Sequence, residues 1–270
     1  MKPVAPYIGG KRNLAGRLAE IIGRVPHATY VEPFVGMGGV FFRRTAKPAG
    51  EVINDISGDV ATLFRVLQRH YQYFINLLQF ELTTRKRFEQ LVRTDPTTLT
   101  DLERAARFLY LQRTSFGGKV AARSFGVVIG SGARFDVTKL GPLLEAVHER
   151  LAGTVIECLP WPELIDRYDR PDTLFYLDPP YYGCEKDYGR DVFSRDDFKA
   201  LAERLAQIKG RFVLSLNDVP AVRQIFAGFK IESVETTYTV GGAGKAKRVA
   251  EVIITDRATR AVATRRREAA

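Results

Sequence analysis

The chain has 270 residues, of which 45% are hydrophobic, so it can bury a core and is not expected to be disordered. Its 41 Lys and Arg against 31 Asp and Glu give a formal net charge of +10, which favours a polyanionic partner such as nucleic acid, although an ordinary basic protein stays open. The two cysteines, Cys158 and Cys184, are too few for a disulfide framework and have no neighbours at metal-ligand spacing. Because the cysteines and histidines form no such cluster, we expect no metal. No signal peptide or membrane span is evident, so we expect a cytoplasmic protein.

Residues 30–60 predict the first half of a nucleotide-binding α/β sheet. A strand, a glycine turn, the start of a helix and a second strand follow one another at residues 30–34, 36–39, 40–42 and 52–53. Glycines after a strand permit a tight turn close to a ligand, and Asp55, about 20 residues further on, stands where a carboxylate bonds ribose hydroxyls. The spacing does not fit G-x-G-x-x-G, so a dinucleotide site is disfavoured. A plain strand–helix turn with a capping Asp55 stays open.

From residue 59 the apolar residues follow helical spacing, and residues 101–113 and 138–151 also predict helices. Between these two helices lies a Gly- and Arg-rich stretch, residues 113–134, with Phe116 and Phe125 interleaved. We therefore predict a helical insertion at residues 59–153 with one exposed basic loop. It divides a catalytic domain made of residues 1–58 and 154–256.

The strand–helix alternation resumes after residue 153. We expect strands at residues 155–156, 174–177 and 212–216, and a closing hairpin from residues 232–240 and 249–255. Ser194 followed by Asp197 is a helix-start pattern, and it leads into residues 198–208. Residues 257–270 carry five arginines and predict a solvated basic tail.

The sharpest chemical feature is the tetrapeptide Asp178, Pro179, Pro180 and Tyr181, placed directly after the buried strand at residues 174–177. Two prolines stiffen the backbone and remove two N–H donors, so carbonyl acceptors dominate locally. Asp178 adds a side-chain acceptor at the carboxyl end of a strand, where ligands bind in such sheets. Tyr181 offers a flat face on which a base can stack. A rigid loop with incidental polarity is the alternative.

An aromatic amine is a poor nucleophile because its lone pair is delocalised into the ring. Two acceptors bonded to its two N–H groups favour a more nucleophilic nitrogen, and S-adenosylmethionine already carries an activated methyl group. The protein must then align the reacting atoms and stabilise the charge that develops on nitrogen, without a metal.

The chain resembles the Dam-type, or D12-class, DNA adenine-N6 methyltransferases over roughly residues 5–255. The resemblance rests on residues 7–11, the glycine turn, Asn54 with Asp55, residues 109–118, the tetrapeptide and residues 215–218. It implies an α/β fold, a Rossmann-like S-adenosylmethionine-dependent methyltransferase sheet with a helical target-recognition insertion. It also implies transfer of a methyl group to N6 of a flipped adenine in double-stranded DNA, as in restriction-modification or DNA adenine methylation.

The same resemblance implies a set of site residues. The catalytic group is Asp178, Pro179, Pro180 and Tyr181. The residues expected to bind the methyl donor are Tyr7, Lys11, Glu32, Pro33, Phe34, Gly36, Gly38, Asp55 and Asp178. The family usually has Trp where this chain has Tyr7, and asparagines are common where Gln112 and Gly117 stand. Residues 119–134 match the GATC-specific members poorly, so the target sequence stays open.

A base inside a duplex cannot reach the sheet edge, so we expect base flipping. The predicted DNA-binding residues are Arg113, Lys119, Arg123 and Arg134, with a second phosphate contact from Lys245, Lys247 and Arg248. An ordinary solvated basic loop is the alternative. When bound to DNA the protein would be nucleoid-associated, and a monomer or weak dimer would suffice; a restriction endonuclease partner stays open.

Two other functions compete with this interpretation. RNA adenine and protein glutamine methyltransferases carry related tetrapeptides, usually with Asn in first place, whereas this chain has Asp178. A catalytically silent DNA-binding relative is the other alternative, and the intact tetrapeptide disfavours it.

Overall fold

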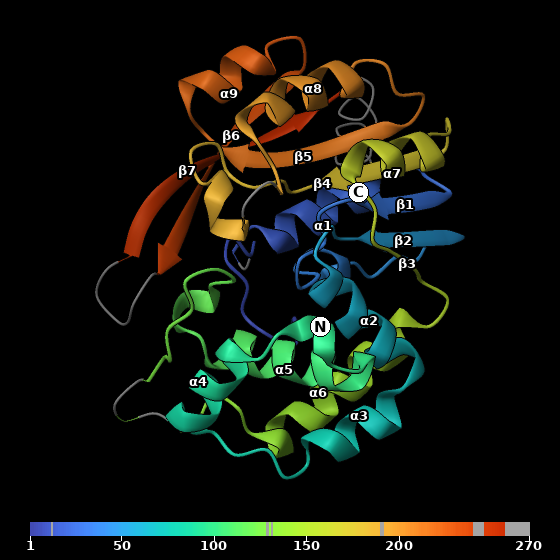
Figure 1. The fold of residues 1–270 in the computed structure, drawn as a ribbon. Coiled ribbons are helices and arrows are strands. Elements are labelled where there is room, and N and C mark those ends of the chain that lie inside the picture. The colour runs from blue at the N-terminus through green and yellow to red at the C-terminus, as the bar shows by residue number, and fades with distance from the viewer. Residues whose placement is uncertain (12, 128–129, 131, 190–191, 240–245, 257–270) are drawn as a thin grey trace.

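The computed structural model describes residues 1–11, 13–127, 130, 132–189, 192–239 and 246–256, and is centred on one mixed sheet (Figure 1). The sheet has the order β3-β2-β1-β4-β5-β7-β6. Its strands are β1 (Thr29–Glu32), β2 (Gly50–Asn54), β3 (Val155–Glu157), β4 (Thr173–Leu177), β5 (Arg211–Asn217), β6 (Lys230–Thr239) and β7 (Ala246–Thr255). The first five are parallel, and β7 lies antiparallel between β5 and β6. The predicted α/β, Rossmann-like fold class is confirmed, since strands 3-2-1-4-5 follow the doubly wound order.

Both faces of this sheet are buried, which is why its central strands read as continuous apolar runs. Tyr30, Leu174 and Tyr176 belong to the core that also holds α1 (Ala15–Arg24) and the insertion. The alternate strand residues pack instead with α7 (Trp161–Tyr168), α8 (Arg195–Leu205) and α9 (Pro220–Ile225). Because β1 to β5 are parallel, their carboxyl ends meet at one edge of the sheet, where the site lies.

The segment from residue 58 to 151 forms the helical lobe drawn below the sheet in Figure 1. Its helices are α2 (Gly58–Arg69), α3 (Tyr71–Leu78), α4 (Arg85–Arg93), α5 (Asp101–Thr114) and α6 (Val137–Leu151). The helices expected at 101–113 and 138–151 are confirmed, as is the helix start at Ser194, whose side chain makes a capping box with Asp197.

The helix expected from Val40 is wrong in extent. Only Phe41–Arg43 is helical, as one turn of 3-10 helix, and the chain becomes extended at Arg44. Gly38 explains the tight geometry, because a Cβ there would stand 2.5 Å from the Phe42 ring. The apolar side chains at 40–42 are thus buried by a compact turn rather than by a helix face.

A buried ionic cluster joins the insertion to the sheet. Glu51 on β2 accepts from Arg44 at 2.8 Å and from both terminal nitrogens of Arg150 on α6 at 2.6 and 2.7 Å. The Arg44 guanidinium also lies 3.5 Å from the centre of the Tyr30 ring. Removing one member of such a cluster leaves a buried charge unpaired. The cluster therefore stabilises the contact of α6, in the helical lobe, with β2 of the sheet.

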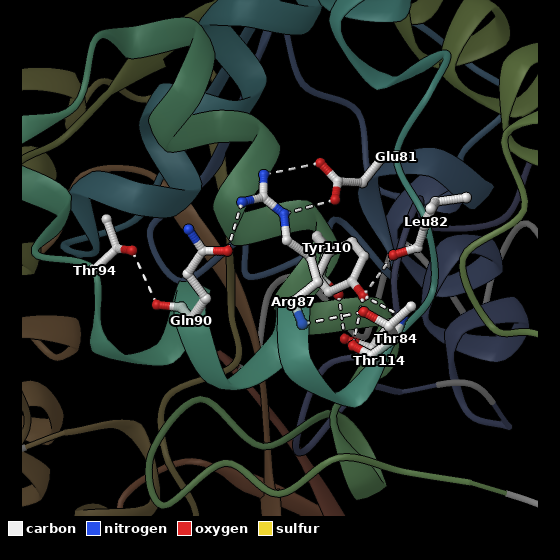
Figure 2. A network of polar contacts seen from close by, with 8 residues as sticks. All are labelled: Glu81, Leu82, Thr84, Arg87, Gln90, Thr94, Tyr110 and Thr114. Carbon is white, nitrogen blue, oxygen red and sulfur yellow. Dashed lines mark hydrogen bonds and ion pairs between the residues drawn. The ribbon is translucent and has the colours of Figure 1, made fainter.

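A polar network holds α4 in place within the insertion (Figure 2). Arg87 donates to both carboxylate oxygens of Glu81, at 2.7 and 3.0 Å, and the Thr84 hydroxyl caps the helix by accepting from the Arg87 amide. Tyr110 on α5 accepts from the Thr84 amide at 3.1 Å, and Thr114 donates back to the Tyr110 carbonyl at 2.7 Å. The start of α4 is therefore pinned to α5, beside the loop that follows α5.

The expected hairpin is confirmed as the antiparallel pair β6 and β7, though β7 begins earlier than predicted, at Ala246. The predicted tail at 257–270 and Lys245 lie outside the described residues, and the side chains of Lys247 and Arg248 are not described either. Within the described part of the chain, no helix is long and apolar enough to cross a membrane.

Candidate active site

Asp178 lies at the carboxyl end of β4, a strand whose five residues are all buried. Its Oδ1 accepts from the Ser215 hydroxyl on β5 at 3.2 Å, and Ser215 shares a 2.9 Å hydrogen bond with the Tyr176 hydroxyl. Burial raises the pKa of the Asp178 carboxyl to about 6, while the charge of Lys11 opposes that rise. Asp178 is thus an ionised acceptor at neutral pH, at the end of an apolar strand.

Lys11 lies beside the tetrapeptide. Its Nζ is 2.9 Å from Asp178 Oδ1 and 3.2 Å from Glu251 Oε2, and it donates to the Tyr181 hydroxyl at 2.5 Å. The ammonium also lies 4.1 Å from the centre of the Tyr181 ring. The Lys11 side chain is 1% exposed and that of Glu251 is 0% exposed, so both are shielded from water, whereas the Asp178 side chain is 20% exposed.

The glycine turn brings Tyr7 against the start of the site. Gly36 has φ +50°, and a Cβ on it would stand 3.0 Å from the Tyr7 ring. Asp55 accepts from the amides of Gly36 and Ser57, each at 2.9 Å, and burial raises the pKa of its carboxyl to about 6. An aromatic face, a closely approached backbone and a carboxylate therefore meet at the ends of β1 and β2.

Glu32 lies inward of this turn and is 2% exposed. Its Oε2 accepts from the Tyr30 hydroxyl at 2.6 Å. Burial raises the pKa of the Glu32 carboxyl to about 8, and the nearby negative charge of Asp178 adds to the rise. Its neighbour Pro33 accepts from the buried amide of Asn54 at 2.9 Å, while Phe34 packs edge-on against Phe193.

Two side-chain contacts hold the segment that follows the tetrapeptide. Asn217, at the end of β5, accepts from the Tyr182 amide at 2.9 Å and donates to the Tyr182 carbonyl at 3.0 Å. Further on, the Tyr188 hydroxyl donates to the Ile8 carbonyl at 3.1 Å. Gly9 permits this approach, since a Cβ there would collide with the Tyr188 hydroxyl.

The predicted DNA-binding arginines donate largely to the protein itself. Arg113 donates to the carbonyls of Arg134 and Val4, at 3.0 and 2.7 Å. Arg134 donates to the Ser115 carbonyl at 3.2 Å, and Arg123 donates to the Gln112 side chain at 3.4 Å. These three brace the loop after α5, whereas Lys119 on the same loop is exposed. Their contact with DNA stays a prediction.

The structure thus brings Lys11 to Asp178 and Tyr181, and Tyr7 to Gly36 and Asp55, all of which the sequence analysis assigned to the site. Gly38 serves the packing of Phe42, and Glu32 lies in the core. Sequence reasoning missed Glu251, although a lone acid in the apolar run of β7 was a visible signal. It also missed the structural use of the loop arginines, which charge alone does not reveal.

Comparison with known proteins identifies the family. The model of the D12 class N6 adenine-specific DNA methyltransferases matches residues 7–240. A Type II methyltransferase of Lactococcus lactis subsp. cremoris, M1.LlaDCHI, is 26% identical over 95% of this chain and 95% of its own length. M.CviBI of Paramecium bursaria Chlorella virus NC1A is 22% identical over 88% and 91%, and M.MjaIII of Methanocaldococcus jannaschii is 25% identical over 87% and 91%.

Proposed function

Because the chain belongs to the D12 class of N6 adenine-specific DNA methyltransferases, we propose that Asp178, Pro179, Pro180 and Tyr181 are its catalytic group. The observation that carries this proposal is a partly buried, ionised acceptor, Asp178, 20% exposed at the end of the buried strand β4 and beside an aromatic ring. Alternative substrates, RNA adenine or protein glutamine, are disfavoured by the family match.

The reaction proposed for this site follows from its acceptors. Asp178 accepts one hydrogen bond from the adenine amine, and the stiffened backbone at the two prolines supplies a carbonyl for the other. With S-adenosylmethionine bound, the amine nitrogen would take its methyl group, the carbon–sulfur electron pair would stay on sulfur, and the proton that the nitrogen loses would pass to water. Both acceptors stabilise the positive charge that develops on the amine nitrogen.

S-adenosylmethionine, when bound, supplies the activated methyl group. The site has the partners that such a ligand needs. Each Asp55 oxygen already accepts one backbone amide, which leaves acceptor capacity for ribose hydroxyls. The Tyr7 ring offers an apolar face, and the carboxylates Asp55 and Asp178 complement a cation. We propose that these residues, with the turn at Gly36, hold the methyl donor.

The DNA would lie across the insertion, with the target adenine flipped toward Tyr181. The exposed Lys119 on the loop after α5 supports this placement. So does Arg85 at the start of α4, which is exposed and lies over the Phe125 ring at 5.2 Å. Phe125 belongs to the same loop as Lys119, and we propose that both cations contact phosphates.

The Asp178→Asn variant tests the catalytic assignment. Asn keeps the size of the side chain but turns a charged acceptor into a weaker one, so we expect the single-turnover methylation rate to fall by about 10²–10³-fold. DNA affinity, measured by fluorescence anisotropy, should stay within a few-fold of the wild type because Asp178 carries no phosphate contact. A variant that methylates at the wild-type rate would refute the role of Asp178.

A further inference from the structure

Glu251 is a buried carboxylate that the proposed reaction does not yet use. It lies on β7 opposite Asn217 of β5, and the antiparallel insertion of β7 beside β5 carries it toward Asp178. Its side chain is 0% exposed and lies 3.2 Å from Lys11 Nζ. A buried charge is costly unless paired, so the sequence retains Glu251 in an apolar strand at an energetic cost.

The two carboxylates share one cation. The Lys11 ammonium lies 2.9 Å from Asp178, 3.2 Å from Glu251 and 2.5 Å from the Tyr181 hydroxyl. It hydrogen-bonds Asp178 and Tyr181 and forms an ion pair with Glu251, so it is held between the two acids. Any change in how tightly Glu251 holds Lys11 must change how tightly Lys11 holds Asp178.

We propose that Glu251 is a positioning residue for methyl transfer, which acts on Asp178 through the ammonium of Lys11 that both carboxylates share. Because Lys11 also pairs with Glu251, its ammonium attracts Asp178 less strongly than it would alone. The Asp178 carboxylate is therefore a stronger hydrogen-bond acceptor for the adenine amine than it would be without Glu251. The role of Asp178 in the reaction rests on the proposed function, whereas the coupling between the two carboxylates does not.

The charged and polar groups around Asp178 shift its pKa and that of its neighbours in opposite directions. The charge of Glu251 on β7 raises the pKa of Asp178, and Glu32 at the end of β1 raises the pKa of the Tyr176 hydroxyl. Lys11 and the Ser215 hydroxyl on β5 lower the pKa of Asp178. Glu251→Gln removes a like charge and lets Lys11 bond Asp178 more closely, so both changes lower the pKa of Asp178. Lys11→Gln has the opposite sign.

The experiment measures the Asp178 carboxyl directly, in the free protein without DNA or methyl donor. Protein labelled with ¹³C at the aspartate carboxyl is titrated by NMR, and Asp178→Asn identifies the resonance. We expect Glu251→Gln to lower the Asp178 midpoint by about one pH unit, and Lys11→Gln to raise it by about one unit. Glu235→Gln removes an exposed charge from neighbouring β6 and should leave the midpoint unchanged.

The pH profile of single-turnover methylation gives the functional reading. The acid limb should move to lower pH in Glu251→Gln, and the plateau rate should fall several-fold because a less basic carboxylate is a poorer acceptor. In a Lys11→Gln background the additional effect of Glu251→Gln should shrink, since the ammonium through which it acts is absent. The double variant loses one positive and one negative charge and leaves neither unpaired. If Glu251→Gln alone does not fold, the double variant is compared with Lys11→Gln instead.

An unchanged Asp178 midpoint in Glu251→Gln, with only a lower melting temperature, would overturn the proposal and leave Glu251 a purely structural partner of Lys11. Full additivity in the double variant would also overturn it. A failure of the proposed catalytic role of Asp178 would be distinguished by a different result. Asp178→Asn would then methylate at the wild-type rate, whatever the NMR midpoints show.

Discussion

At the scale of single residues, burial and hydrogen-bonding or charged partners together decide the protonation states of three carboxyl groups in the site. Glu32 has only a neutral hydroxyl bonded to it, so burial dominates and its pKa rises to about 8. Asp55 accepts two backbone amides and Asp178 faces Lys11, so their pKa values rise only to about 6. At neutral pH the molecule therefore keeps Asp55 and Asp178 ionised and Glu32 protonated.

The protonated Glu32 makes stability depend on pH. Its pKa rises from 4.5 to about 8 on folding, so the folded state binds more protons than the unfolded state across that window. The wild type should therefore lose stability as pH rises from about 5 to 8, relative to Glu32→Gln, which cannot ionise but still accepts from Tyr30. Urea unfolding across this range measures the difference, with exposed Glu203→Gln as control. Parallel stability curves for wild type and Glu32→Gln would contradict the assignment.

At the scale of elements, the loop after α5 supports the N-terminal segment that carries Tyr7 and Lys11. The Gln112 side chain, fully buried on α5, donates to the carbonyls of Pro6 at 2.8 Å and Gly118 at 2.5 Å. The Gly118 carbonyl in turn accepts from the Ile8 amide at 3.2 Å. The helical insertion and the proposed donor site thus share one hydrogen-bonded corner.

Gln112→Ala tests this link between elements. It leaves the part-buried Pro6 carbonyl without this donor, while the Gly118 carbonyl keeps the Ile8 amide, so we expect a loss of about 1 kcal/mol in the free energy of unfolding. Affinity for S-adenosylmethionine, measured by calorimetry, should also fall, because Tyr7 follows the Pro6 carbonyl that loses its anchor. Gln72→Ala, exposed on α3, should change neither quantity. Unaltered donor affinity in a destabilised Gln112→Ala would show that the corner serves folding alone.

The element scale also shows what the sequence could predict. The central strands could be predicted because strands buried on both faces consist of apolar runs. Helices α5, α6 and α8 could be predicted from their apolar periodicity and their capping residues. The single turn at Phe41–Arg43 was not, since three apolar residues after glycines fit a helix as well as a compact turn. Likewise Glu251 reached the site only through the antiparallel placement of β7 beside β5, a long-range pairing that no local pattern specifies.

At the scale of the whole molecule, a buried ionic cluster at Glu51 holds a basic helical lobe against the sheet, and the formal charge of +10 favours a polyanion. Net charge correctly indicated nucleic acid as partner, but did not separate exposed cations from those that brace the loop. Arg113 and Arg123 donate inward, and burial lowers the pKa of both guanidinium groups. Exposed Lys119 is therefore the stronger candidate for a phosphate contact.

The salt dependence of DNA binding tests that ranking. Lys119→Ala should weaken binding to all sequences alike and reduce the slope of log K against log salt by about one, as loss of one phosphate contact does. Lys209→Ala serves as control, because Lys209 is exposed just before β5, at the end of the sheet away from Asp178. An unchanged slope in Lys119→Ala would remove this residue from the DNA interface.

The most direct test of the account is to sequence DNA, with detection of modified bases, from cells that lack other adenine methylation and express the protein. We predict N6-methyladenine in a defined sequence context with the wild-type chain and its near-complete loss with Asp178→Asn at equal protein level. Methylation of cytosine instead, or equal adenine methylation by the two proteins, would contradict the assignment of Asp178 and its strand end as the adenine N6 transfer site.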